Sequence, residues 1–494
     1  MKLQNFHQSL DTLHVNCCSP RAYFIPFDSA DAALHDPREQ SRVLTSLNGE
    51  WQFQYYAAPA DIPDSVTGQN ADVLQEHIQV PGCWQTQGFD RYAYTNFDFP
   101  FPYDPPFVPH ENPAGVYART FTLPAQHETE KYRHYITFEG VMSCFYLYIN
   151  GKFAAYSQVS HSPSEIDITD YVHAGVNNIT VIVLKWCDGS YLEDQGMFRL
   201  NGIFRDVYIL SRPKKHVEDY FVHPSVSDDL KSCSVTVDFS VPEGLAITCT
   251  LIDPNGETIG QTTATADKPA YFSIASPQLW SAEFPDLYTL LFDCNGEYIA
   301  QKVGLKHFAL HDGVIELNHR AIKFKGVNRH DYNPQVGCAV NEEMMRKDLM
   351  MMKAHHINAI RASHYPNDPR FLQMCDQYGF YVIDEADMEC HGVVSIDGGY
   401  KTEQYGLIAK DETFEKPILD RVIRLVERDK NSTCVLLWSM GNESGWGINF
   451  IKALQWTKRR DPDRLTHYEN VSCHGTDTCL LYTSPSPRDT ERSR

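Results

Sequence analysis

Hydrophobic and polar residues alternate in short runs from about residue 45 to 212, and turn residues separate the runs. Examples are YITFEG, FYLYINGKFAAYS and NNITVIVLKW. Such alternation is typical of half-buried strands in antiparallel sheets. Asn150-Gly151, between two aromatic-rich runs, suits a hairpin turn with positive φ angles. The pattern predicts an N-terminal extended segment, 1–44, followed by an antiparallel β-sandwich over 45–212.

A second β-rich region covers residues 213–310. It contains the runs SCSVTVDFS, AITCTLIDPNGETIG and LYTLLFDCNGEYIA, with Pro-Asn-Gly and Asn-Gly turns. About a hundred residues with this pattern is typical of an immunoglobulin-like β-sandwich.

After about residue 315 the rhythm changes to strands that alternate with amphipathic helices. Within 417–429, for example, Ile418, Val422 and Leu425 share one helix face. Apolar strands alternating with such helices predict a parallel sheet covered by helices. Only about five strand segments are visible over 311–473, whereas a closed (β/α)8 barrel needs eight. The fold class is therefore multidomain, with two sandwiches and an incomplete TIM barrel.

The last residues, 474–494, abandon this alternation. The segment CLLYTSPSPRDTERSR mixes Ser, Pro, Thr and Arg and does not predict a further helix. It is either a flexible native tail or, as we prefer, non-native sequence such as translated vector DNA.

Composition narrows the functional classes. The net charge of −21 disfavours nucleic acid as a partner. The N-terminus lacks the apolar core of a signal peptide, and no run is long enough to cross a bilayer, which predicts a cytoplasmic protein without membrane contact. Fourteen cysteines without a CxxC pair disfavour a zinc ribbon or a disulfide framework.

Glu443 is the first candidate catalytic residue. It follows the apolar run CVLLWSM, directly after Gly441 and Asn442, with Trp438 and Trp446 close in sequence. Indole surroundings would disfavour its charged form, which suits a general acid. The alternative is a glutamate that caps the next helix. The strand end, the asparagine and the aromatic residues together favour catalysis.

The segment DEADMECHG places several ionisable side chains after another apolar run: Asp384, Glu385, Asp387, Glu389 and His391. Repulsion among the carboxylates requires an arginine or a bound cation. In an extended chain Glu389 and His391 point to the same side and offer one oxygen and one nitrogen ligand. Mainly oxygen ligands, without thiolates, predict Mg²⁺ or Mn²⁺ rather than zinc. The alternative is a helix N-terminus rich in carboxylates.

His330 and His364 follow two other strand segments, in GVNRHD and RASHYP. The C-terminal ends of all strands in a (β/α)8 barrel meet at one face, where active sites lie. One histidine at a strand end is usually structural, but two at the same face indicate hydrogen bonds to a hydroxyl-rich ligand. With the aromatic residues they predict a carbohydrate site.

Several segments carry a family resemblance: SLNGEWQF, VPGCWQTQGFDRYAYTN, PPFVPHENPAGVYARTF, WCDGSYLEDQGMFRLNGIFRDVYIL, GVNRHDYNP, IRASHYPNDPRF, YVIDEADMECHG and LLWSMGNESGWG. They are similar to the large lac-type bacterial β-galactosidases of glycoside hydrolase family 2, and the resemblance covers nearly everything up to about residue 470. GIFRDV and GNES also fit the β-glucuronidases and β-mannosidases of that family. DGSYLEDQ and ENPAGVY are more particular to the galactosidases.

The resemblance implies a jelly-roll sugar-binding domain, an immunoglobulin-like domain and a catalytic barrel, in an enzyme that hydrolyses terminal β-D-galactosides such as lactose. It assigns the acid/base role to Glu443 and the Mg²⁺ ligands to Glu389, His391 and Glu443. Further residues match positions around the galactosyl group: Asn96, Asp188, His330, His364 and Asn442. Asp188 also matches a Na⁺ site, and the family forms homo-oligomers, namely tetramers.

Retaining glycosidases also need a carboxylate nucleophile. The family takes it from a later barrel strand, so the resemblance assigns this role to none of Glu385, Glu389 and Glu469. We therefore expect a truncated β-galactosidase that is inactive alone. Two alternatives stay open, a non-catalytic galactose-binding or assembly fragment and a β-glucuronidase or β-mannosidase of the same family.

Overall fold

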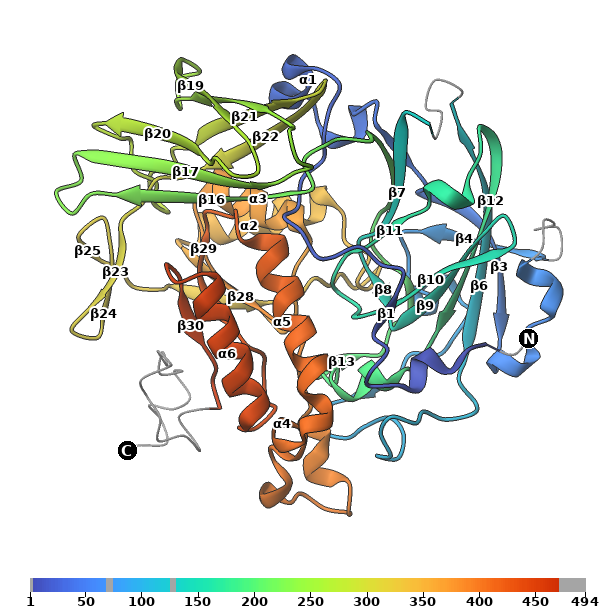
Figure 1. The fold of residues 1–494 in the computed structure, drawn as a ribbon. Helices are drawn as coiled ribbons and strands as arrows, with labels where there is room; N and C mark the ends of the chain where they lie inside the picture. Colours follow the sequence, from blue (N-terminus) through green and yellow to red (C-terminus); the bar gives the residue numbers. More distant parts are fainter. Residues whose placement is uncertain (1–2, 68–73, 125–129, 471–494) are drawn as a thin grey trace.

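Two antiparallel sandwiches precede a parallel sheet covered by helices (Figure 1), which confirms the predicted fold class. The structure is a computed structural model that describes residues 3–67, 74–124 and 130–470. The predicted non-native tail, 474–494, lies outside the described residues.

The first sandwich pairs a seven-stranded with a four-stranded sheet. In spatial order the larger sheet contains β1 (His14–Val15), β10 (Lys152–Gln158), β9 (Cys144–Ile149), β12 (Gly175–Leu184), β6 (Ala114–Leu123), β3 (Gly49–Tyr56) and β4 (Glu76–Val80). The smaller contains β11 (Ser164–Asp167), β7 (Tyr132–Phe138), β15 (Val207–Pro213) and β2 (Leu44–Ser46). Two short pairs join its loops: β5 (Tyr94–Thr95) with β13 (Met197–Phe198), and β8 (Val141–Met142) with β14 (Gly202–Ile203).

Side chains of strand β9 pack against other residues on both faces of the larger sheet. Phe145 and Leu147 point into the core between the sheets, whereas Tyr146 packs on the opposite face with Leu3 of the N-terminal segment. The predicted hairpin between β9 and β10 is confirmed, because Asn150 and Gly151 have φ angles of 50° and 79°.

The second sandwich contains a three-stranded and a four-stranded sheet. The strands are β16 (Asp219–Val226), β17 (Ser232–Ser240) and β20 (Ala270–Ala275), and β19 (Thr258–Ala264), β18 (Ile247–Ile252), β21 (Tyr288–Cys294) and β22 (Glu297–Val303). Burial alternates along β17, where Val235 and Val237 enter the core between solvent-facing neighbours. The short helix α1 (Ala30–His35) lies beside β22.

The third unit holds the parallel sheet. A small antiparallel sheet comes first, with β23 (Phe308–His311), β24 (Val314–Leu317) and β25 (Arg320–Ala321). The parallel strands then pair in sequence order: β26 (Gly326–Arg329), β27 (Ala359–Ala362), β28 (Tyr381–Glu385), β29 (Val435–Ser439) and β30 (Leu465–His467). The helices are α2 (Glu342–Ala354), α3 (Pro369–Tyr378), α4 (Leu407–Lys410), α5 (Glu415–Asp429) and α6 (Ile448–Arg460). Sequential parallel neighbours are the arrangement of a (β/α)8 barrel, and five of its strands lie within the described residues.

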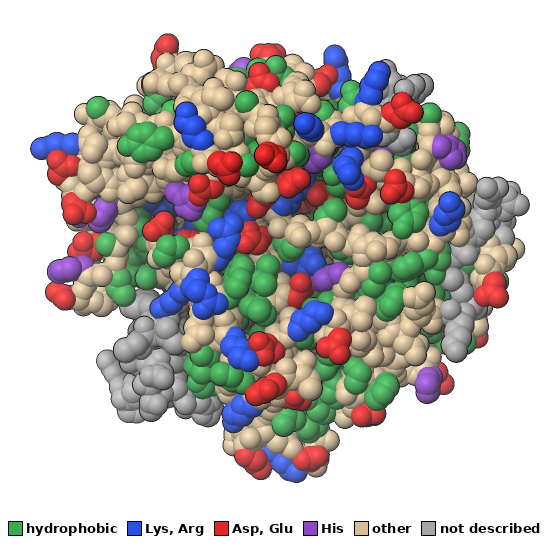
Figure 2. Space-filling model, viewed as in Figure 1, with side chains coloured by type: hydrophobic (Ala, Val, Ile, Leu, Met, Phe, Trp, Pro, Cys, Tyr) green, Lys and Arg blue, Asp and Glu red, His purple; other side chains and the backbone are tan. Residues whose placement is uncertain are grey.

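The fully buried Trp438 of β29 lies in the core between this sheet and its helices, and α5 contributes Ile418, Val422 and Leu425 to that core, the helix face predicted from the sequence. Within the described part of the chain, no helix is long and apolar enough to cross a membrane. Figure 2 shows acidic and basic side chains interspersed on the visible face.

Buried ion pairs fasten the parallel sheet to the first sandwich. Arg421 of α5 is 1% exposed, and its Nη1 donates to Glu193 Oε1 at 2.6 Å and to the carbonyl of Asp387 at 3.0 Å. A buried charge is costly when its partner is removed. The arginine therefore holds the β28 loop against residues that the sandwich supplies.

Arg421→Met should lower the free energy of unfolding by about 3–5 kcal/mol, because the buried Glu193 would lose its cationic partner. The matched control is Arg133→Met, which breaks a half-exposed pair with Asp167 and should cost less than about 1 kcal/mol. Urea unfolding followed by tryptophan fluorescence measures both values. Equal losses in the two variants would contradict the role of Arg421.

Candidate active site

The loops after β28 and β29 lie side by side at the C-terminal edge of the sheet. The backbone N–H of Asn442 donates to the carbonyl of Met388 at 2.8 Å, and that of Cys390 donates to Ser444 Oγ at 3.1 Å. Neighbouring parallel strands end at the same edge, so these hydrogen bonds join the two acidic motifs that the sequence singled out.

Three potential metal ligands meet where the loops join. Glu389, His391 and Glu443 each offer one ligand atom, and these atoms all lie within 4.8 Å of one another. His391 Nδ1 is 2.8 Å from Glu443 Oε2. Two carboxylates and one imidazole form a mainly oxygen donor set, which fits Mg²⁺ or Mn²⁺ better than zinc.

The surroundings of Glu389 disfavour its charged form. Its side chain is buried, and Asn442 Nδ2 donates to its Oε2 at 2.9 Å. Burial, followed by the charges of Glu443, Asp194 and Glu385, raises the pKa of Glu389 well above its usual range. A bound cation would offset this excess of negative charge, so the electrostatics agree with the donor set.

The negative charge of Glu385, in contrast, is balanced by hydrogen bonds and an ion pair. Arg361 Nε and Nη2 donate to its two oxygens at 2.8 and 3.0 Å, and Ser439 Oγ donates at 2.7 Å. His364 Nδ1 lies 2.9 Å from Oε1. Burial alone would raise the pKa of Glu385, but Arg361, His364 and Ser439 outweigh it and lower the pKa to about 2. An arginine therefore relieves part of the repulsion within DEADMECHG, and Glu389 and Glu443 are left for a cation.

The helix-cap interpretations of the two motifs are wrong. The short 3-10 helix His391–Ser395, which begins within DEADMECHG, has no acidic residue in its first turn. Helix α6 has Gly447 at its N-cap position, without a side-chain cap, so Glu443 does not cap it.

The expected indole environment of Glu443 is also wrong. Trp438 points into the core and donates to Asp461 Oδ2 at 2.9 Å, and Trp446 stacks on Tyr468 with ring centroids 6.0 Å apart. Glu443 instead contacts His391, and its backbone N–H donates to Glu469 Oε1 at 3.1 Å. An imidazole and a second carboxyl group therefore adjoin Glu443, and the indole of Trp438 does not.

Three further predicted residues lie beside the carboxylates: His330, His364 and Asn442. They follow different strands, which were predicted to end at the same face of the barrel. The rings of His330 and His364 lie 5.3 Å apart, edge to face, and Arg361 Nη2 donates to Asn442 Oδ1 at 2.9 Å. Burial, followed by the nearby His364, lowers the pKa of His330 to about 4. Its imidazole is therefore neutral at pH 7 and can donate or accept a hydrogen bond.

Asn96 lies at the rim of the site. It is exposed beside Gly196, where an added Cβ would come within 2.7 Å of Asn96 Oδ1. The next residue, Phe97, places its ring 6.3 Å from that of His391, and its carbonyl accepts a hydrogen bond from Ser395.

Asp188 precedes the loop that carries Glu193 and Asp194. It is fully buried in the wall of the first sandwich, where Gln158 Nε2 donates to its Oδ2 at 3.3 Å and the backbone of Ser9 is a further neighbour. Burial raises its pKa to about 6. Its other oxygen, Oδ1, has no hydrogen-bond partner among the described residues, and the galactosyl and Na⁺ roles of Asp188 stay predictions.

The sequence did not assign a role to Arg361, Asp194 or Tyr400. Arg361 stands in the strand-end segment IRASHYP. An arginine at the end of one strand, next to a strand that ends in an acidic motif, was a signal from which the ion pair could have been predicted. Tyr400, whose OH lies 3.1 Å from His391 Nε2, and Asp194, whose carboxylate reaches the loop after β28 from the sandwich, had no signal in their local sequence.

Comparison with known proteins identifies the family. Three models match consecutive parts of the chain: the sugar-binding domain of glycosyl hydrolases family 2 over 44–213, a second family 2 domain over 215–306, and the family 2 TIM barrel domain over 308–486. The chain belongs to glycosyl hydrolase family 2.

Among its relatives is a protein named β-galactosidase from Actinobacillus pleuropneumoniae, which is 46% identical over 97% of this chain and 49% of that protein. Another, from Staphylococcus xylosus, is 41% identical over 95% of this chain and 47% of that protein. The chain thus spans about half the length of these relatives.

Solved structures of β-glucuronidases share the fold. The enzyme from Ruminococcus gnavus superposes with a TM-score of 0.73 at 20% identity, over 89% of this chain and 76% of that chain. One from an uncultured Clostridium species gives 0.70 at 21% identity, over 86% and 72%. At these identities the likeness concerns the architecture alone.

The pairing of Glu385 predicts how stability depends on pH. A folded pKa of about 2 against an ordinary 4.5 means that its contribution is present above pH 4.5 and is lost as the pH falls towards 2. The stability difference between wild type and Glu385→Gln should therefore shrink by about 3 kcal/mol between pH 6 and pH 2.

Urea unfolding at a series of pH values measures this difference. Glu257→Gln, which alters an exposed carboxylate of the second sandwich, should follow the wild-type pH dependence. A pH-independent difference for Glu385→Gln would mean that Glu385 is not held ionised by Arg361.

Proposed function

We propose that this chain forms the galactoside-binding and acid/base part of a β-galactosidase, a retaining enzyme for terminal non-reducing β-D-galactose residues. The proposal rests on the grouping of Glu389, His391 and Glu443 beside the His330–His364 pair. The 46% and 41% identical relatives are named β-galactosidases, which supports galactose as the sugar.

Glu443 is the proposed acid/base residue. Its carboxyl group would protonate the glycosidic oxygen in the first step and accept a proton from water in the second. His391, 2.8 Å away, restrains its orientation. A bound Mg²⁺ or Mn²⁺, held by Glu389, His391 and Glu443, would supply the positive charge that offsets these carboxylates.

Neutral hydrogen-bonding groups would receive the sugar. His330 is uncharged at neutral pH, and Arg361 and Glu389 fix the two ends of the Asn442 amide. Asn442 therefore presents a fixed amide beside Glu443, where a galactosyl hydroxyl can bind.

The electrostatics favour a galactoside over a glucuronide. A glucuronide carries a carboxylate that needs a cationic partner. At this face Arg361 is already engaged by both oxygens of Glu385 and by Asn442. An uncharged sugar fits this environment better, although the fold is shared with β-glucuronidases.

The second carboxylate of a retaining site should stand about 5–5.5 Å from Glu443. The acids beside Glu443 have other partners: Glu389 belongs to the ligand group, Arg361 holds Glu385, and Glu469 accepts the N–H of Glu443. We assign the nucleophile to none of them.

We further propose a cytoplasmic location and assembly into a homo-oligomer. The twelve cysteines within the described residues are all free thiols, ten of them buried, which agrees with a reducing compartment.

Binding of a non-hydrolysable thio-β-galactoside, measured by calorimetry in Mg²⁺, tests the substrate class. We expect saturable binding, and about tenfold weaker binding for His330→Ala because one hydrogen bond is lost. His77→Ala, an exposed histidine of β4, should bind as wild type does. A preference for the thio-β-glucuronide, or no binding of either sugar, would contradict the proposal.

Turnover of a chromogenic β-galactoside separates binding from catalysis. Since each acid beside Glu443 already has a partner, we expect the chain alone to bind without hydrolysis. Hydrolysis that disappears in Glu443→Gln would instead show that another carboxylate of this chain acts as the nucleophile.

A further inference from the structure

The loop that carries Glu389 pairs with a segment of the first sandwich. The backbone N–H of Glu389 donates to the carbonyl of Leu192 at 2.8 Å, and the N–H of Asp194 donates to the carbonyl of Glu389 at 2.9 Å. Nearly two hundred positions of sequence separate the two strands of this short parallel bridge. The backbone position of a predicted metal ligand is therefore set by the sandwich as well as by the parallel sheet.

Asp194 extends this contact to the second predicted ligand. Its side chain is 1% exposed, and its Oδ2 accepts the backbone N–H of Gly392 at 2.8 Å. Gly392 directly follows His391. A Cβ at position 392 would stand 2.6 Å from Asp194 Oδ2, so the absence of a side chain there allows the carboxylate to approach.

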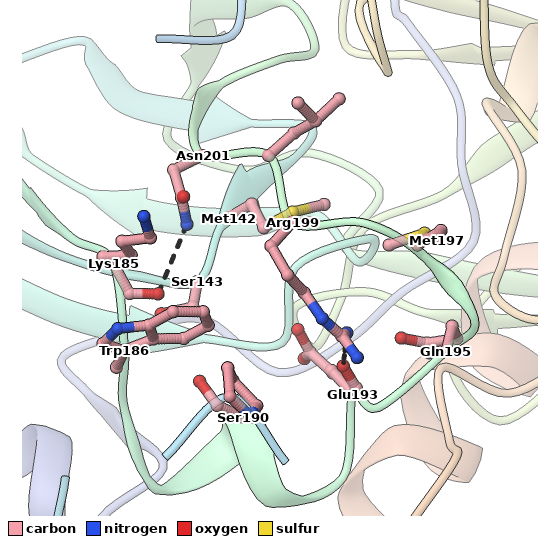
Figure 3. Close-up of a pocket in the computed structure, with 12 residues that line it drawn as sticks. Met142, Ser143, Lys185, Trp186, Ser190, Glu193, Gln195, Met197, Arg199 and Asn201 are labelled. Carbon is pink, nitrogen blue, oxygen red and sulfur yellow. Dashed lines mark hydrogen bonds between the residues drawn. The ribbon is translucent and has the colours of Figure 1, made fainter. Parts of the chain in front are cut away.

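Arg199 holds the other oxygen of Asp194. Its Nη2 donates to Asp194 Oδ1 at 2.7 Å, its Nη1 to the carbonyl of Glu193 at 2.8 Å, and its Nε to Thr95 Oγ1 at 2.7 Å. Figure 3 shows the guanidinium of Arg199 reaching towards Glu193 at the edge of a pocket in the sandwich. With both oxygens bonded, the Asp194 carboxylate has one defined orientation.

We propose that Asp194 is a positioning residue for the cation site, which it serves from the first sandwich by fixing the backbone on both sides of His391. The inference rests on the proposed function, in which Glu389, His391 and Glu443 hold a divalent cation. Asp194 touches none of the reacting atoms. It acts by restricting the loop, because ligands that are held in place lose less freedom when a metal binds.

Mn²⁺ binding to the purified chain, followed by the electron paramagnetic resonance signal of free Mn²⁺, tests this role without requiring turnover. Glu389→Gln identifies the binding that belongs to this site, since it removes a ligand. Asp194→Asn places an amide N–H₂ against either Arg199 or the N–H of Gly392. We expect its Mn²⁺ affinity to fall about 10- to 100-fold, the usual effect of losing a partner of a ligand.

The matched control is Glu297→Gln in the second sandwich, which alters an equally buried carboxylate paired with Arg212. It should lower the thermal midpoint and leave the Mn²⁺ affinity unchanged. Gly392→Ala is the second variant, because it keeps the Asp194–Arg199 pair while its added methyl group crowds Asp194 Oδ2 and the backbone of Phe99. It should also weaken Mn²⁺ binding.

The outcomes separate the two hypotheses. Wild-type protein that binds no Mn²⁺ at a site sensitive to Glu389→Gln would overturn the cation site and the inference with it. Wild-type binding that Asp194→Asn and Gly392→Ala leave unchanged would overturn the positioning role alone. Weaker binding in both variants, with Glu297→Gln unaffected, is the result that the proposal requires.

Discussion

A buried polar seam between the first sandwich and the parallel sheet determines the arrangement of the site. At its centre Asp387 accepts hydrogen bonds from the backbone and Nδ1 of His161 and from Gln195 Nε2, and Arg421 lies against it from α5. Buried charges are tolerated only when their partners are present in good geometry. Because the partners come from different units, the seam permits one relative position of the sandwich and the loop after β28.

The acidic residues at the end of β28 and in that loop then divide by environment. Glu385 is neutralised by Arg361, and Asp387 by His161 and Arg421. Burial and the neighbouring Asp429 raise the pKa of Asp384. Glu389 has the amide of Asn442 as its hydrogen-bond partner and stands next to Glu443. The protein thus compensates most of the motif internally and concentrates the remaining negative charge at the point where a cation and the acid/base residue are proposed.

Local patterns predicted the units and much of the site. The alternating burial along β17 and the apolar face of α5 both follow from the order of apolar and polar residues within a short stretch of sequence. The meeting of His330, His364 and Glu443 follows from a geometric rule for parallel strands. Features that depend on partners far along the chain could not be found in this way.

One error shows where local reasoning ends. Trp438 lies close to Glu443 in sequence, but it turns into the core to reach Asp461. Asp194 contacts a loop from another unit, and no local periodicity encodes such a contact. Residue type and spacing indicated the chemistry, whereas only the tertiary contacts determined which carboxyl groups share a site.

The central claim is that residues of two adjacent strand-end loops, held by the sandwich, form one divalent cation site beside the acid/base glutamate. Anomalous diffraction from crystals of the chain soaked in Mn²⁺ tests it most directly. The account predicts a manganese peak within about 2.0–2.4 Å of ligand atoms from Glu389, His391 and Glu443. Ordered side chains at this position without a peak, or manganese bound only elsewhere, would contradict the account.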